Sequence, residues 1–191
     1  MPVFAIWREF KAMTKAEEET LRMLAIAGTR WLPGVRWVRS FGMDLDSERP
    51  RTVCIYEGPT LDSVVEHSRC CALPVTSVSQ VTAYANHDLH HYGESAIGPL
   101  VLVTRNAAGS ESNFGDGDAT WLRSFEASER SVTLSLFSGS DAEAVARFAD
   151  LRPGDSIEAV VESVPADVAH LYDSLGLPRH WEEAHAPVSD R

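Results

Sequence analysis

The stretches WVRSF, at residues 37–41, and WLRSF, at residues 121–125, are nearly the same five residues in the two halves of a chain of 191 residues. Each copy is followed, in the same order, by an apolar stretch, a glycine-containing break, an amphipathic segment, a proline and a second apolar stretch. These downstream parts occupy residues 53–81 and 134–161, and the offset between the copies changes only at the breaks. Duplication followed by loop trimming leaves such a record, so we expect one structural unit to occur twice.

The first copy predicts the order strand, helix, strand, strand, helix, strand. Thr14 and Glu17 have the spacing of a capping box, in which hydroxyl and carboxylate each bind an unpaired backbone N–H. A helix should therefore begin there, and it should end at Pro33 and Gly34. Strands rich in aromatic and β-branched residues are expected on either side. The expected strands are residues 3–10, 35–43, 51–57 and 77–85, and the second helix covers about residues 60–72.

The second copy is expected to lack its first helix. Residues 97–105 provide a first strand, but residues 106–118 contain almost no apolar side chains, which predicts a loop. After the last strand, residues 166–176 place Val168 and Leu171 on one helical face. We expect this C-terminal helix to fill the place that the missing helix leaves.

The order β-α-β-β-α-β is that of the ferredoxin-like split arrangement, an antiparallel sheet with two helices on one face. The other face needs a cover, which a second unit in the same chain supplies. The expected fold class is therefore α+β, with tandem ferredoxin-like repeats that form a pseudo-dimeric α+β barrel or sandwich. We expect a first repeat at residues 1–86, a histidine-rich linker at 87–97, a second repeat at 98–165, and a C-terminal helix and tail at 166–191.

Acidic residues outnumber basic ones, and the formal net charge is -11. Nucleic-acid binding needs clustered Lys and Arg, so this composition argues against a nucleic-acid partner. No apolar run approaches the ~18 residues of a bilayer span, and MPVFAIWREF at the N-terminus lacks the pattern of a signal peptide. The cysteine count is odd, and Cys70 and Cys71 are adjacent, which disfavours a stapling disulfide. We expect a cytoplasmic protein with reduced thiols and no membrane partner.

Four parts of the first copy occur in an order that resembles a known family. They are WVRSF at residues 37–41, VCIYEGP at 53–59, Glu66-His67 in the second helix, and Leu73-Pro74 before the last strand. The family consists of small bacterial ferredoxin-like proteins, formerly a domain of unknown function and now usually labelled nickel-binding. The resemblance covers roughly residues 2–85, and it extends more weakly over residues 100–164. It implies an α+β barrel of the dimeric type and a nickel site where ligands are present.

The resemblance aligns His67 with the helix histidine of the family. Cys70 lies three residues further along the same helix, and Cys54 and Glu57 lie in the preceding strand. Imidazole and thiolate are donors that nickel, zinc and copper accept, so these four residues are the candidate site for nickel or another divalent transition metal. The alternative is that His67 and Cys54 are parts of the core. Three positions of the second copy that correspond to Cys54, Glu57 and His67 hold Ser135, Ser138 and Arg147.

The linker HDLHHY, at residues 87–92, offers a second set of ligands. His87, His90 and His91 could close around a transition metal, although this spacing matches no standard zinc pattern. The alternative is a solvated polar linker that binds metal only weakly.

An enzymatic interpretation starts from the aromatic residues of the expected strands. Paired ferredoxin-like sheets often enclose an apolar pocket in which a polar residue polarises a carbonyl or transfers a proton. The candidates for lining such a pocket are Trp7, Trp37, Arg39, Tyr56 and Trp121. The alternative is that these aromatic side chains are plain core.

The leading hypothesis is a non-enzymatic protein that binds a transition metal or a small ligand in the first repeat. One alternative is a small-molecule enzyme of the dimeric α+β barrel type, such as a cofactor-free monooxygenase or cyclase, and another is a structural module that binds a partner. An enzymatic activity is left open, although the leading hypothesis includes none. No glycine-rich phosphate loop follows a strand, so no nucleotide cofactor is expected. We expect a monomer with an internal pseudo-dimer, with a homodimer as the alternative.

Overall fold

The computed structural model describes residues 1–85, 89, 99–106 and 119–183. The strands are β1 (Val3–Glu9), β2 (Arg36–Met43), β3 (Arg51–Glu57), β4 (Ser77–Ala85), β5 (Leu100–Arg105), β6 (Ala119–Ala127), β7 (Val132–Gly139) and β8 (Ser156–Ser163). The α-helices are α1 (Lys15–Gly28), α2 (Leu61–Cys70), α3 (Ala142–Phe148), α4 (Ala169–Leu175) and α5 (His180–Glu183). Short 3-10 turns cover Ser128–Arg130 and Pro165–Val168.

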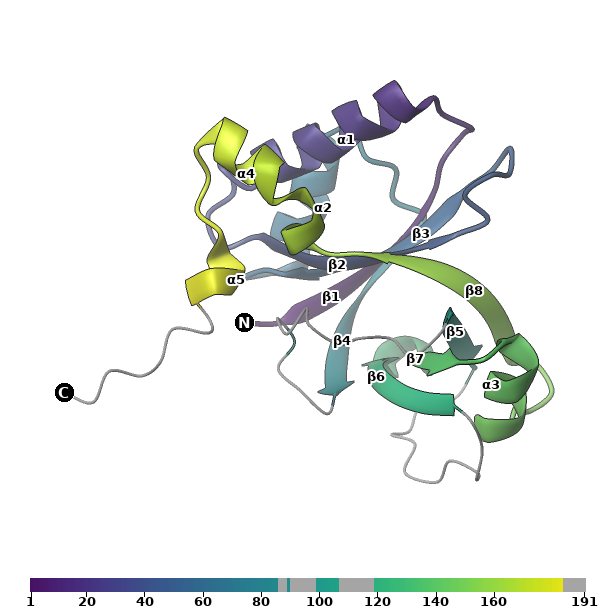
Figure 1. Ribbon diagram of the computed structural model, residues 1–191. Helices are drawn as coiled ribbons and strands as arrows, with labels where there is room; N and C mark the ends of the chain where they lie inside the picture. Colours follow the sequence, from purple (N-terminus) through teal and green to yellow (C-terminus); the bar gives the residue numbers. More distant parts are fainter. Residues whose placement is uncertain (86–88, 90–98, 107–118, 184–191) are drawn as a thin grey trace.

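The eight strands close into one antiparallel barrel in the order β1-β3-β2-β8-β5-β7-β6-β4 (Figure 1). Strands of the two halves are hydrogen-bonded to each other at two seams, β2 with β8 and β4 with β6. The expected fold class, tandem ferredoxin-like repeats within an α+β architecture, is therefore wrong as a description of this molecule. Closure leaves none of these eight described strands at an open edge, and it gives them one shared interior instead of two separately covered sheets.

The interior of the barrel is filled by side chains from alternate positions of all eight strands, as the two-residue period of a strand requires. This interior cluster consists of Ala5, Val38, Phe41, Met43, Val53, Ile55, Val81, Leu102, Phe125, Ala127, Leu134, Leu136 and Val160. Because it draws on both halves, neither half has a complete core of its own.

The two WxRSF motifs have the same local geometry on β2 and β6. In each motif the register of pairing shifts just after the tryptophan, which marks a β-bulge. The indole N–H of Trp37 donates to Ser40 Oγ at 2.9 Å, and that of Trp121 donates to Ser124 Oγ at 2.8 Å. A bulge bends and twists a strand, as barrel closure requires, so the repeated motif marks two corresponding bends of the barrel.

The remaining motif side chains point into the barrel. The rings of Phe41 and Phe125 meet there, with centroids 6.1 Å apart. Arg39 and Arg123 are each only 1% exposed. Arg39 donates to Glu162 Oε1 at 2.6 Å and to the carbonyl oxygen of Leu89 at 2.6 Å. The motif thus contributes both to the bends and to the interior.

The helices lie outside the barrel. The capping box of Thr14 and Glu17 is confirmed, and α1 and α2 cover the outer face of β1 and β3 in a second apolar cluster. In this cluster, α4 packs beside α1 through Leu171 and Tyr172, next to Val168 of the preceding 3-10 turn (Figure 1). The C-terminal helix therefore does not fill a vacancy over the second half, as the sequence predicted. That outer face is covered instead by α3, in a third cluster. Among the described residues, no helix is long and apolar enough to cross a membrane.

Helices α1 and α2 approach closely at Gly28. A Cβ atom at this position would overlap Cys71 Sγ and come within 3.1 Å of His67 Nε2. Gly28→Ala should therefore lower the free energy of unfolding by about 1–3 kcal/mol in urea denaturation, although helix propensity alone favours alanine. The double variant Gly28→Ala/Cys71→Ala removes the overlapping sulfur and should be more stable than additivity predicts. A Gly28→Ala variant as stable as the wild type would contradict this close approach.

Candidate functional site

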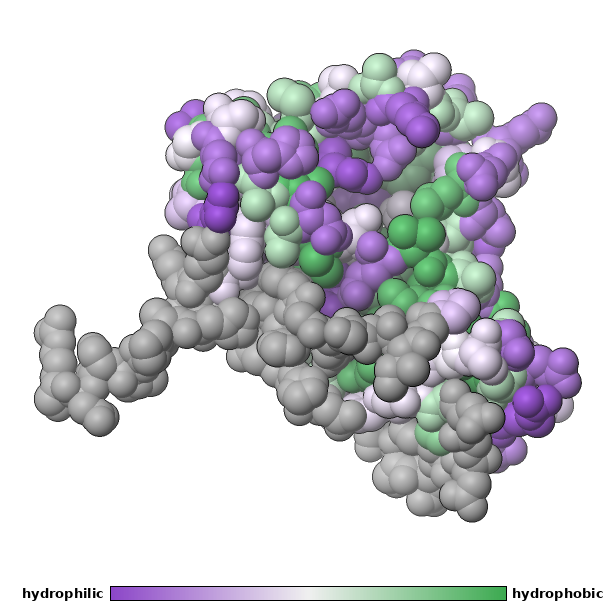
Figure 2. Space-filling model, in the orientation of Figure 1, coloured by the Kyte–Doolittle hydropathy of each residue, from purple (hydrophilic) through white to green (hydrophobic). Residues whose placement is uncertain are grey.

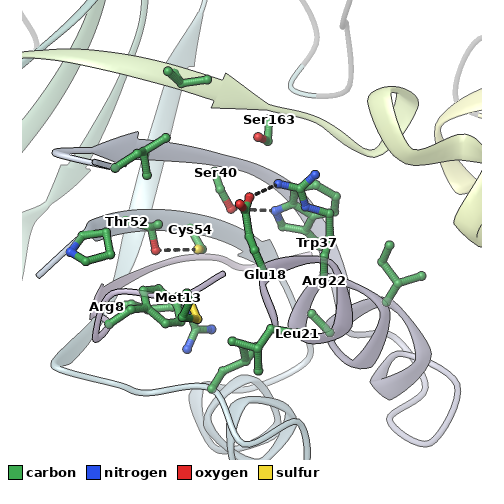
Figure 3. Close-up of a pocket in the computed structure, with 18 of the residues that line it drawn as sticks. Arg8, Met13, Glu18, Leu21, Arg22, Trp37, Ser40, Thr52, Cys54 and Ser163 are labelled. Carbon is green, nitrogen blue, oxygen red and sulfur yellow. Dashed lines mark hydrogen bonds and ion pairs between the residues drawn. The ribbon is translucent and has the colours of Figure 1, made fainter. Parts of the chain in front are cut away.

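A cavity of about 270 Å³ lies between α1 and the outer face of β3, β2 and β8. Figure 2 shows the molecule hollowed beneath α1, with apolar residues along one wall. The side chains that line the cavity come from α1, from the segment before it, from the β2–β3 turn, from the segment after α2 and from the four strands β1, β3, β2 and β8 (Figure 3).

The floor of the cavity is a patch of small polar side chains. Pairing registers place Ser163, Ser40 and Cys54 side by side on β8, β2 and β3. One step along the strands, Gly42 is level with Thr52, which in turn pairs with Arg8 of β1. Neighbours in such rows are about 5 Å apart, so these side chains form one continuous surface.

The walls are apolar and the mouth is charged. The apolar lining consists of Phe10, Met13, Leu21, Ala25, Ile26, Trp37, Leu45, Pro50, Leu73 and Val161. Glu18 and Arg22 are one turn apart on α1 and form an ion pair at 2.6 Å beside the cavity (Figure 3). Both side chains are partly exposed, so this pair lies at the solvent side of the site.

Arg8 provides a buried positive charge at the β1 end of the floor. Its side chain is held by two hydrogen bonds, Nη1 to the carbonyl oxygen of Pro74 at 2.6 Å and Nη2 to Ser68 Oγ at 2.9 Å. The guanidinium carbon lies 5.9 Å from the centre of the Tyr56 ring. Burial by itself lowers the pKa of Arg8, but the nearby Cys54 and Tyr56 raise it, and the net direction is upward. Arg8 therefore remains protonated and fixed in place.

Tyr56 is a neutral hydrogen-bonding group next to this charge, and Cys54 lies on the same face of β3. Burial raises the pKa of Tyr56 far above its usual value, in spite of the opposing effect of Arg8. The Cys54 sulfur lies 3.3 Å from the hydroxyl of Thr52 on the same strand. The site thus combines one fixed cation with a phenol, a thiol and several hydroxyls, all beneath apolar walls.

His67 is fully buried between α2 and α1, and it is not part of the cavity lining. Its Nε2 donates to the carbonyl oxygen of Ala25 at 2.8 Å, and its ring packs on Tyr56 with centroids 5.3 Å apart. Cys71 Sγ lies 3.8 Å from the same nitrogen and donates to the carbonyl oxygen of Leu24 at 3.2 Å. Burial lowers the pKa of His67, so the imidazole is neutral and joins the two helices.

The predicted metal site is not assembled. Among the described residues, no group of three or more His, Cys, Asp or Glu side chains could hold a metal ion. Cys70 is exposed, and its sulfur lies 3.4 Å from Glu66 Oε1. The thiol beside His67 is that of Cys71 instead. Glu57 and Cys54 project from opposite faces of β3 because side chains alternate along a strand. The prediction that this set of four residues binds nickel or another metal is therefore wrong.

The linker histidines His87, His90 and His91 lie outside the described residues. The second predicted metal set therefore stays a prediction.

Two of the five predicted pocket residues line the cavity, Trp37 and Tyr56. Trp7 packs against the interior cluster instead, Arg39 lies inside the barrel, and Trp121 packs on the outer face of the second half. The strand bulge separates Trp37 from Arg39, because it turns their side chains to different faces.

Sequence reasoning missed the polar floor residues Arg8, Ser40, Thr52 and Ser163. For Arg8 a signal was present, because it follows Phe4 and Ile6 at the two-residue spacing of one strand face. A charged residue in phase with two buried apolar ones indicates a polar site beneath a cover. The serines gave no such signal, because their alignment depends on pairing between β2 and β8, which are far apart in the sequence.

No family model and no curated protein matches this chain, so the resemblance to the nickel-labelled family stays a prediction. Among solved structures, the chain is similar to a protein from Lactobacillus acidophilus NCFM that is provisionally assigned as a monooxygenase. The TM-score is 0.41 at 10% sequence identity, over 84% of this chain and 93% of that one. A likeness this distant carries no functional argument, so the function must be inferred from the site.

The buried His67 predicts a pH dependence of stability. Its pKa is lowered in the folded protein and returns to about 6.5 on unfolding. Below that pH the unfolded state binds a proton that the folded state does not, so stability falls as pH decreases, by up to about 1.4 kcal/mol per pH unit. His67→Gln can retain a donor to Ala25 without titrating, so its unfolding free energy should fall less steeply between about pH 6.5 and 5. Equal slopes in urea titrations of both proteins would contradict the assignment.

Proposed function

We propose that the protein binds and activates a small organic molecule with an apolar, ring-sized body and one acidic oxygen, in the cavity beneath α1. The observation that carries this proposal is the polar floor beneath apolar walls. Ser163, Ser40 and Cys54 lie side by side where a covered sheet face would ordinarily present apolar side chains. Specific ligand pockets have this composition, with mostly apolar walls and a few polar groups that fix orientation.

The cavity volume limits the size of the ligand. An engineered apolar cavity of about 150 Å³ binds benzene, so about 270 Å³ is enough for a two-ring molecule. Hydrocarbon rings would contact Leu21, Ile26 and Trp37, while the oxygen of the ligand would face the floor. The net charge of the whole chain is negative, so attraction for an anionic ligand would depend on the local charge of Arg8.

Activation would result from the fixed charge of Arg8. A positive charge held by Pro74 and Ser68 beneath a partly dry cavity favours negative charge on a ligand oxygen, and it needs no reorganisation when that charge forms. A phenol or an enol bound here should lose its proton to water at the mouth more readily than in solution. The resulting oxyanion is electron-rich, which is the form required by a cofactor-free monooxygenase or a cyclase.

The test uses 1-naphthol and its hydrocarbon analogue naphthalene as probes. In calorimetric titrations, we expect both to bind and 1-naphthol to bind more tightly. Absorption of the naphtholate should show that the pKa of bound 1-naphthol lies lower than that of the free probe by about one unit or more. Arg8→Met should remove this decrease, whereas Arg8→Lys should retain part of it because the charge is kept.

Two variants that each introduce a phenylalanine on α1 test whether the probes bind in the cavity. Ala25→Phe places a ring in the cavity and should abolish binding of both probes, whereas Ala16→Phe, on the exposed side of α1, should leave both affinities unchanged. The proposed function would be refuted if the wild type bound neither probe. It would also be refuted if the pKa of bound 1-naphthol were the same in a folded Arg8→Met variant as in the wild type.

A further inference from the structure

Each half of the barrel contains a Trp–Ser hydrogen bond beside one further side chain on the paired strand. That side chain is a cysteine in the first half and a serine in the second. In the second half, Ser124 accepts a hydrogen bond from Trp121 Nε1 at 2.8 Å, and its oxygen lies 2.8 Å from Ser135 Oγ on the paired strand. Ser124 and Ser135 are 3% and 0% exposed, so both hydroxyls are shielded from solvent. Their hydrogen bond to each other satisfies them within the protein.

In the first half, Ser40 accepts from Trp37 Nε1 at 2.9 Å, but its partner across the strand pair is Cys54. Sulfur is a weak hydrogen-bond acceptor, and the Cys54 sulfur lies instead against the Thr52 hydroxyl at 3.3 Å. Among the described residues, none accepts a hydrogen bond from the Ser40 hydroxyl. Because its oxygen already accepts from Trp37, Ser40 is left with a proton to donate at the cavity floor (Figure 3).

We infer that Ser40 is the specificity-determining residue of the cavity, and that it donates a hydrogen bond to the acceptor oxygen of the bound molecule. The inference rests on the proposed function, because it requires the cavity to be the binding site. Trp37 orients the hydroxyl, and Ser163 provides a second hydroxyl beside it on β8. The role of Cys54 is indirect, because its sulfur leaves the Ser40 proton available where a serine would accept it.

This arrangement defines the chemical class of the ligand more narrowly. The Ser40 donor and the Arg8 charge favour an oxygen that accepts hydrogen bonds, such as a phenolate, an enolate or a carbonyl. A hydrocarbon of the same shape would fill the cavity but leave the Ser40 hydroxyl without an acceptor, and a buried hydroxyl without a partner weakens binding.

The experiment exchanges sulfur for oxygen in the two rows. Cys54→Ser introduces a hydroxyl that can accept from Ser40, in the place that Ser135 occupies beside Ser124 in the second half. We expect calorimetry to show a decrease of about three- to tenfold in the affinity for 1-naphthol, with little change for naphthalene. Ser40→Ala should give a similar loss, and Cys54→Ala should cause a distinctly smaller loss than Cys54→Ser because it introduces no acceptor.

The reciprocal variant Ser135→Cys is the matched control. It makes the opposite exchange in the second half, at a residue that does not line the cavity, and it should leave both affinities unchanged. Equal losses in Cys54→Ser and Cys54→Ala would show that the thiol itself contacts the ligand, which would overturn the inference and leave the proposed function standing. Unchanged 1-naphthol affinity in Cys54→Ser and Ser40→Ala would overturn it in the same way. A wild-type protein that binds neither probe would refute the proposed function and this inference together.

Discussion

Hydrogen bonding across the two seams, β2 with β8 and β4 with β6, is the constraint on which the rest of the structure depends. These pairs join residues far apart in the sequence, and they turn eight short strands into one barrel without edges. Once the barrel is closed, every strand has an inner and an outer face. The inner faces pack together in one cluster, so the outer faces are left for the helices and for function.

The outer faces of the two halves differ in how their polar side chains are hydrogen-bonded, although the sequence motifs are similar. In the second half, α3 covers a row in which Ser124 and Ser135 satisfy each other. In the first half, the helices leave the end of the corresponding row open, and Cys54 does not satisfy Ser40. Buried polar groups are normally paired, so an incompletely paired row at the floor of a cavity is more informative about function than the apolar walls around it.

The sequence predicts local features well, because local chemistry determines them. The capping box at Thr14 and the strand at residues 77–85 depend only on neighbouring residues, and both occur in the structure. Pairing between distant strands and the bulge after Trp37 do not follow from spacing, and they decide which residues share a face. Trp37 therefore lines the cavity while Arg39 lies inside the barrel, and the serines of the floor were missed.

The misplaced metal site has the same origin. Three-residue spacing along a helix suggested that His67 and Cys70 act together. Cys70 is exposed, however, and the thiol that lies against His67 near Gly28 is that of Cys71. Burial makes the imidazole neutral, and its hydrogen bond to α1 makes it a structural link. His67 is fully buried, whereas the polar surface around Arg8 lines the cavity. A row of polar side chains beneath a helix packs less well than apolar ones would, and such departures from core packing are common at binding sites.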